Sequence, residues 1–141
     1  VGEQTAERIK IEIGSAAKVA EDTTLEVRGR DNTTGLPGRT EITSEEIREA
    51  LQDPVRSIVD AVKRTLDRAE PELAADLIDN GICLVGGGAL LRGLDVVIKE
   101  DTGLDVTIAD DPLTCVARGT SIYLENLEDW KATMESDMDD L

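Results

Sequence analysis

Residues 82–91 read Ile82-Cys83-Leu84-Val85-Gly86-Gly87-Gly88-Ala89-Leu90-Leu91, an apolar run that meets three glycines and then resumes at helical spacing. This pattern predicts a strand, a tight loop and the start of a helix. Residues without Cβ allow positive φ and let a flat ligand approach the main chain, while a helix N-terminus directs free N–H groups at the loop. The loop is therefore a candidate nucleotide site, although its spacing is neither GxGxxG nor a P-loop and glycine can also serve packing alone.

The segments that follow the glycines complete a predicted βαβ unit. Residues 105–109 form a second apolar strand, and Asp111-Pro112 begins a helix that runs to about Leu127. Continuous apolar strands suit a parallel sheet covered on both faces, and such sheets bind ligands at the carboxyl ends of their strands, where the glycine loop lies. The helix between the strands ends at Gly103 and is marked by Leu90, Leu91, Leu94, Val97 and Ile98.

The start of the chain predicts a helix and a hairpin. Residues 1 to about 17 have amphipathic helical spacing that is interrupted near Gly14. Leu25–Arg28 and Thr40–Thr43 alternate as strands around a loop that contains glycine and proline. This pattern indicates a hairpin with a long tip.

A long helix is expected after the hairpin. Thr43-Ser44-Glu45-Glu46 has the pattern of a capping box. An apolar stripe from Ile47 to Leu66 follows at helical spacing and is interpreted as core rather than as a groove for a partner. Pro54 would either kink this helix or end and restart it. A short helix from Pro71 to about Ile78 then precedes Gly81.

Composition limits the function classes. The chain has 141 residues, carries a net charge of −16 and lacks histidine, the commonest general base. The charge argues against binding to nucleic acid or to anionic membranes, because both need clustered Lys and Arg. No segment reaches the ~18 apolar residues of a membrane span and no signal peptide opens the chain, so the cytoplasm is the expected compartment. Cys83 and Cys115 are expected to be reduced packing thiols.

Several segments resemble the MreB family of bacterial actin homologues, and they occur in the order of that family. Residues 2–15 (GEQTAERIKIEIGS) resemble the helix that contacts adenosine, and residues 27–30 (VRGR) resemble the hairpin that follows it. Residues 71–74 (PELA) and 85–92 (VGGGALLR) resemble later segments, and residues 111–119 (DPLTCVARG) are the most specific match. The resemblance covers nearly all of residues 1–128. Because the sequence starts at Val1 rather than Met, we expect an excised or truncated piece.

The resemblance implies the actin and Hsp70 ATPase fold, an α/β fold that binds ATP with Mg²⁺ between two lobes. The chain resembles the C-terminal part of that fold, with a βαβ core, a piece of hairpin subdomain and the final crossing helix. Residues 1–43 would form part of the upper subdomain, 44–111 the lower subdomain, 112–128 the last helix and 129–141 an acidic tail. The phosphate hairpins and the residue that positions the attacking water belong to segments absent here. We therefore expect no catalytic residue and no ATPase activity in this chain alone.

The resemblance assigns the adenosine contacts to two segments. Glu7, Arg8, Ile9 and Lys10 form one turn, in which Glu7 would accept hydrogen bonds from ribose or base, Lys10 would lie along the nucleoside, and the middle pair would contribute position. The alternative is that Glu7 and Lys10 form only an i,i+3 ion pair. The second segment would lie under adenine and ribose and consists of Gly86, Gly87, Gly88, Ala89 and Leu90.

Two acidic features are expected to have no ligand. Asp111 before Pro112 is interpreted as a helix cap rather than as half of a metal pair with Asp110. The tail after about Trp130 is expected to be mobile, because its carboxylates repel one another and it offers little apolar surface to bury. The alternative is docking through Met134, Met138 and Leu141.

The resemblance also implies partners and a place in the cell. Proteins of this kind polymerise head-to-tail and organise cell-wall synthesis and rod shape, so self-association is expected. Further partners would be cell-wall elongation and membrane scaffold proteins such as RodZ, with filaments beneath the inner membrane and no nucleic acid bound. The alternatives are a non-catalytic α/β interaction module and another actin-like filament protein, such as a plasmid-segregation ATPase.

Overall fold

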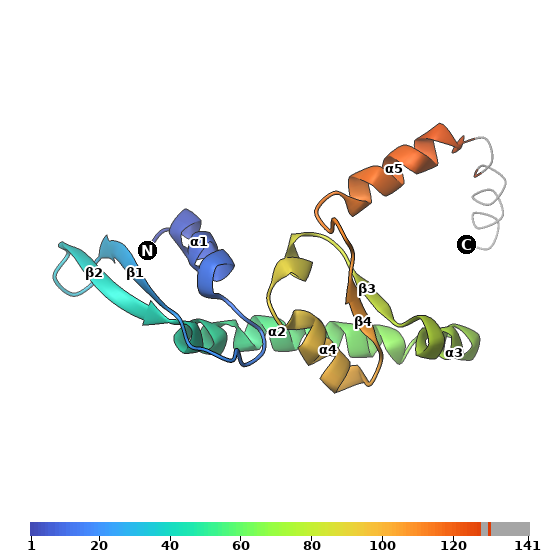
Figure 1. The fold of residues 1–141 in the computed structure, drawn as a ribbon, viewed down its shortest axis with the longest axis horizontal. Coiled ribbons are helices and arrows are strands. Elements are labelled where there is room, and N and C mark those ends of the chain that lie inside the picture. The colour runs from blue at the N-terminus through green and yellow to red at the C-terminus, as the bar shows by residue number, and fades with distance from the viewer. Residues whose placement is uncertain (128–129, 131–141) are drawn as a thin grey trace.

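The computed structural model describes residues 1–127 and Trp130 and shows a mixed α/β chain (Figure 1). The longest helix, α2 (Ser44–Leu66), runs along the long axis of the molecule, and α5 (Cys115–Glu125) projects away from it (Figure 1). The expectations for residues 131–141 fall outside the described residues. The elements, in chain order, are α1 (Glu3–Ile13), β1 (Thr24–Arg30), β2 (Pro37–Thr43), α2 (Ser44–Leu66), α3 (Pro71–Asn80), β3 (Ile82–Leu84), the 3₁₀ helix η1 (Gly87–Leu90), α4 (Leu94–Thr102), β4 (Val106–Ile108) and α5 (Cys115–Glu125).

The first group of elements packs α1 on the β1–β2 hairpin. The two strands are antiparallel, with Val27 opposite Thr40, which confirms the predicted hairpin. Its core consists of Ile9, Ile13 and Val27, all of them buried. The predicted interruption near Gly14 is confirmed, because Gly14 is extended (φ −69°, ψ 143°) and α1 stops at Ile13. The expected continuation of the helix to residue 17 is wrong.

The long helix α2 begins at the predicted capping box. The Glu46 N–H donates to Thr43 Oγ1 over 3.2 Å, and the Thr43 N–H donates to Glu46 Oε2 over 2.8 Å. The helix continues through Pro54 as one element, so the chain does not end and restart a helix there. Val55 of the predicted stripe is buried together with Val59, and Leu51 and Val62 pack against the same core, which confirms these positions of the stripe. The prediction is wrong at Ile58, which is 43% exposed.

Removal of the cap should measurably weaken the chain. We expect Thr43→Ala to lower the free energy of unfolding by about 1 kcal/mol, because the Glu46 N–H loses its acceptor at the start of α2. Thr120→Ala is the matched control, since Thr120 is exposed inside α5 and its change should stay within about 0.5 kcal/mol. Urea unfolding followed by circular dichroism measures both variants. Equal losses in the two would contradict a capping role.

The second group of elements is the predicted βαβ unit. β3 and β4 pair in parallel with Ile82 opposite Val106, and α4 connects them. Leu94 and Ile98 of α4 pack with Val55 and Val59 of α2 to form the larger core, against which Ile82, Leu84 and Val106 are packed. The expected coverage of both sheet faces is wrong for the described residues, because Cys83 on the opposite face of β3 is exposed. Cys83 is therefore not a packing thiol.

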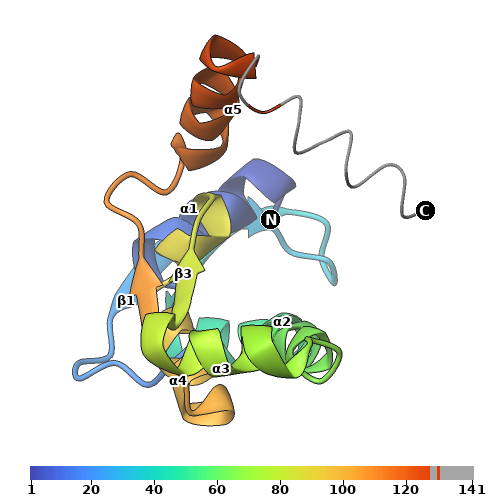
Figure 2. The ribbon, with the colours of Figure 1, turned by 90° about the vertical axis from the view of Figure 1, so that its right-hand side faces the viewer.

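Two short segments frame this unit. α3 ends at Gly81, as predicted, where φ is +69°. The prediction that Asp111 caps the last helix is wrong. The Asp111 carbonyl oxygen accepts the Thr114 N–H in a turn, and α5 begins only at Cys115, with Thr114 as its N-cap residue. Cys115 is half-buried and its thiol donates to that same oxygen over 3.1 Å. α5 projects away from the sheet and contains no buried residue (Figure 2).

Candidate functional site

The glycine loop turns sharply at its first glycine. Gly86 has φ +82° and ψ 175°, a conformation that only glycine adopts readily. Residues 87–90 then form a single 3₁₀ turn, and α4 begins only at Leu94. The expectation that an α-helix N-terminus points at the loop is therefore wrong, because the partial charge of a helix end acts only near its first turn.

The local fold does not require glycine at positions 87 and 88. Neither lies at positive φ. A Cβ built on Gly87 would meet only Leu113 Cδ2, at an ordinary contact distance of 3.5 Å, and a Cβ on Gly88 would meet no atom of the described residues within 4 Å. The packing alternative therefore does not explain these two glycines, whereas Gly86 is explained by its backbone conformation.

The glycine loop is hydrogen-bonded to a neighbouring turn at one end and is exposed at its other two glycines. The Gly86 N–H donates to the Pro112 carbonyl oxygen over 2.7 Å, which joins the loop to the turn before α5. Ala89 is buried, so its side chain belongs to the core and not to a ligand surface. Gly87, Gly88 and Leu90 are exposed. These three residues form the accessible part of the predicted segment.

The other predicted segment is a turn of α1. Lys10 Nζ lies 2.7 Å from Glu7 Oε2, and both side chains are about half exposed. The ion pair between Glu7 and Lys10, which was the alternative interpretation, is thus present. The contact of these two residues with adenosine stays a prediction. Ile9 is buried in the hairpin core and cannot contact a ligand with its side chain. Arg8 is exposed and lies 3.5 Å from Glu12 in a second pair.

The two segments are joined by residues that the sequence analysis did not select. The Arg92 guanidinium donates to the main-chain oxygens of Glu12 (2.7 Å) and Gly14 (3.1 Å), and the Ser15 hydroxyl lies 3.0 Å from the Arg92 oxygen. Ser15 is 1% exposed. Only long-range contact information would have singled them out, because no local motif relates residues 15 and 92.

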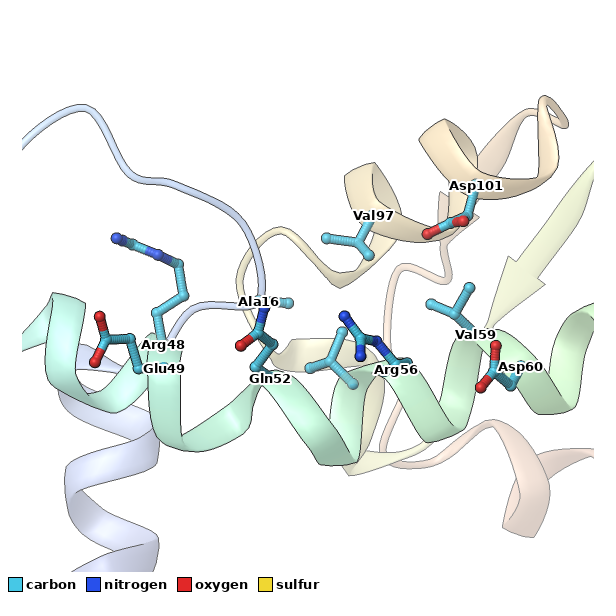
Figure 3. Close-up of a pocket in the computed structure, with 10 residues that line it drawn as sticks. Ala16, Arg48, Glu49, Gln52, Arg56, Val59, Asp60, Val97 and Asp101 are labelled. Atoms are coloured by element: carbon cyan, nitrogen blue, oxygen red, sulfur yellow. The ribbon is translucent and has the colours of Figure 1, made fainter.

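A separate groove of about 660 Å³ lies between α2, α4 and the chain at Ala16 (Figure 3). Val59 and Val97 contribute apolar surface, while Arg48 and Arg56 extend along one part and Asp60 and Asp101 along another (Figure 3). The groove contains none of the predicted adenosine contacts. The groove lies beside the larger core between α2 and α4.

The charged groups with a shifted pKa also lie outside the predicted segments. A hydrogen bond and the charge of Lys99 lower the pKa of Asp105, and the same contacts raise the pKa of Lys99. Backbone N–H groups of Thr33 and Thr34 lower the pKa of Asp31 in the hairpin tip. Within the part of the chain that the structure describes, no cluster of three metal-ligand side chains occurs.

Comparison with known proteins gives one consistent family. The MreB/Mbl protein family matches residues 1–132. The cell shape-determining protein MreB of Escherichia coli K12 is 52% identical over 128 residues, which cover 91% of this chain and 37% of that protein. The cell shape-determining protein Mbl of Bacillus cereus is 49% identical over 128 residues, which cover 91% of this chain and 38% of that protein. The chain thus spans well under half the length of these curated relatives.

Solved structures agree with the sequence relatives. The crystal structure of MreB5 of Spiroplasma citri bound to ADP is 37% identical and aligns with a TM-score of 0.83 over 99% of this chain and 40% of that chain. A crystal structure of the same protein bound to AMPPNP aligns equally well. The MamK double helical filament is 24% identical with a TM-score of 0.65, a likeness of fold alone. These matches confirm the expected partial actin-like α/β fold.

Proposed function

The chain belongs to the MreB/Mbl family of cell shape-determining, actin-like proteins, and we propose that it supplies the adenosine side of an ATP site in a filament-forming cytoskeletal protein. The observation that carries the proposal is the exposed main chain at Gly87 and Gly88. Neither the backbone conformation nor neighbouring described atoms require glycine at these two positions. A flat nucleoside can approach a main chain of this kind closely, because no Cβ stands in its way.

The α1 turn is suited to the opposite wall of such a site. Glu7 and Lys10 lie at i and i+3 of α1, so their side chains share one side of the helix. The Glu7–Lys10 pair is half exposed and contributes at most about 1 kcal/mol, so a ligand can displace it at little cost. In the proposed site, Glu7 accepts from ribose or base and the Lys10 stem lies along the nucleoside.

The proposed ligand is ATP with Mg²⁺. The ADP-bound and AMPPNP-bound crystal structures of MreB5, which is 37% identical to this chain, support an adenine nucleotide. Bound Mg²⁺ would neutralise charge on the phosphates and polarise the transferred phosphoryl group. The described residues contribute nucleoside recognition: they contact, orient and shield the adenosine.

We further propose that filament assembly takes place in the cytoplasm beneath the inner membrane. Self-association is supported by membership of the cell shape-determining family, and scaffold proteins such as RodZ are the proposed link to cell-wall synthesis. None of the helices within residues 1–127 is long and apolar enough to cross a bilayer. We propose that membrane contact is made by a partner or by segments outside this chain.

The test is nucleotide binding by this chain. Because charge-assisted contacts to phosphate and metal contribute much of the affinity for a nucleotide, we expect weak binding and no turnover. Calorimetry with Mg-ATP and a phosphate-release assay measure the two quantities. Turnover, or a Kd below about 1 μM, which corresponds to ~8 kcal/mol, would contradict the prediction.

A titration with adenosine followed by NMR tests whether a weakly bound nucleoside occupies the proposed site. Adenosine added up to ~10 mM should shift the amide resonances of Gly87, Gly88 and the α1 turn in two-dimensional NMR spectra, as expected for a weak site. Resonances in the hairpin tip near Asp31 serve as an internal control. An unchanged spectrum would favour a non-catalytic interaction module instead.

A further inference from the structure

Arg92 closes the C-terminal end of α1 from a distant point in the chain. The last carbonyl groups of a helix lack partners within the helix, and a basic side chain can supply them. Here Arg92 Nη2 donates to the Glu12 oxygen over 2.7 Å, and Arg92 Nε donates to the Gly14 oxygen over 3.1 Å. One planar guanidinium thus binds two main-chain oxygens, two residues apart, at the point where α1 stops.

The main chain around Arg92 is bound in return. The Ala16 N–H donates to the Arg92 oxygen over 2.8 Å, and the buried Ser15 hydroxyl lies 3.0 Å from the same oxygen. At the next residue, a Cβ on Gly93 would come within 2.6 Å of Ala17 Cβ, so the two backbones approach closely. We call residues 14–17 together with residues 92–93 the clasp.

The clasp spans the two cores of the molecule. α1 contributes Ile9 and Ile13 to the hairpin core, whereas Leu94, directly after the clasp, belongs to the core between α2 and α4. The side chain of Ala16 packs against that second core, where it lies across the groove from Val97 (Figure 3). The clasp therefore fixes the position of α1 relative to the larger core between α2 and α4.

The two proposed walls of the adenosine site lie directly next to this clasp. Lys10 precedes Gly14 by one turn of α1, and Leu90, the last residue of η1, precedes Arg92 by two residues. We infer that Arg92 is a positioning residue for the adenosine site: through the clasp, it sets the separation of the α1 turn from the glycine loop without touching the ligand. The inference rests on the proposed function. Small displacements in such sites are costly, since about 1 Å of misplacement can weaken a bound geometry strongly.

Three variants of the 141-residue chain test this role. Arg92→Met keeps the apolar stem and removes both hydrogen bonds, Arg92→Lys keeps the charge and can restore one of them, and Arg64→Met removes an exposed arginine of α2 far from the clasp as the matched control. Adenosine affinity is measured from NMR amide shifts, and hydrogen exchange at the Ala16 amide reports whether the clasp is closed.

The expected result is a graded loss of affinity at constant fold. Arg92→Met should weaken adenosine binding roughly fivefold or more, Arg92→Lys less, and Arg64→Met not at all. Exchange at Ala16 should quicken in Arg92→Met, while amides of α2 and α4 keep the protection of the wild type. Partial rescue by lysine with unchanged protection of α2 and α4 is the sign of positioning, because a loss of core stability would also lower that protection.

Several outcomes would overturn the inference. One is an Arg92→Met variant whose Ala16 amide exchanges quickly but which binds adenosine as the wild type does. A second is an affinity loss matched by equal loss of protection throughout α2 and α4, which would mean a structural role only. In both cases the wild type still binds, so the proposed function stands. A wild type without adenosine-dependent shifts would overturn the proposed function and this inference together.

Discussion

Gly81→Ala should prevent the βαβ unit from forming a stable fold. Gly81 has φ +69° and ψ −160°, a region that side-chain-bearing residues almost never adopt, at a cost of about 1–3 kcal/mol. In addition, a Cβ at this position would lie 2.4 Å from the Asp105 main-chain oxygen. That oxygen accepts the Ile82 N–H over 2.8 Å at the start of the β3–β4 pair, so it cannot move away without loss of the pairing.

The expected loss is about 4 kcal/mol or more, since backbone strain and overpacking act at one site. Gly103→Ala is the matched control. Gly103 also has positive φ (+74°), but it lies in the αL region and a Cβ there would meet no described atom within 4 Å. Its cost should be about 1–2 kcal/mol. Urea unfolding by circular dichroism compares the two, and a difference below about 1 kcal/mol would contradict the clash at Asp105.

Gly87→Val should abolish measurable adenosine binding and leave the fold intact. The new Cβ meets only Leu113 Cδ2 at 3.5 Å, and φ is not positive, so the variant should fold. Its branched side chain would occupy the space in which the nucleoside is proposed to approach the main chain. We expect adenosine affinity to fall roughly tenfold or more, about 1.4 kcal/mol, and Lys10→Ala to weaken it less.

Gly38→Val is the control for this experiment. Gly38 lies in β2, and a Cβ there would meet no described atom within 4 Å. NMR titration with adenosine and a thermal unfolding curve are recorded for each variant. Binding by Gly87→Val equal to that of the wild type at matched stability would refute the adenosine assignment. Unfolding of Gly87→Val alone would show instead that packing requires this glycine.

The candidate site was predictable as a set of residues and less so as a surface. Gly87 and Gly88 were selected from their place after an apolar strand, and the structure leaves their main chain open. The resemblance to the MreB family also predicted Ala89 and Ile9 as adenosine contacts, but both side chains are buried. A motif in the sequence specifies which residues are adjacent along the chain, whereas the packing of the helix or loop decides which of them face outward.

Local chemistry in the sequence by itself determined the elements with short-range causes. The capping box at Thr43 and Glu46, the stop at Gly81 and the β1–β2 hairpin all depend on hydrogen bonds, backbone preferences or alternation within a few residues. The parallel pairing of β3 and β4 followed as well, because a helix between two apolar strands favours that arrangement.

Only the tertiary structure decided the features with long-range causes. α1 ends at Ile13, where Gly14 and Glu12 are held by Arg92, and α4 begins at Leu94 rather than at the glycines, next to the close approach of Gly93 and Ala17. Cys83 is exposed because only one face of the β3–β4 sheet packs on α2 and α4. The physical reason is common to all three: the deciding contacts join residues about 80 positions apart, or depend on which side of a sheet is covered, and helical or strand periodicity carries neither kind of information.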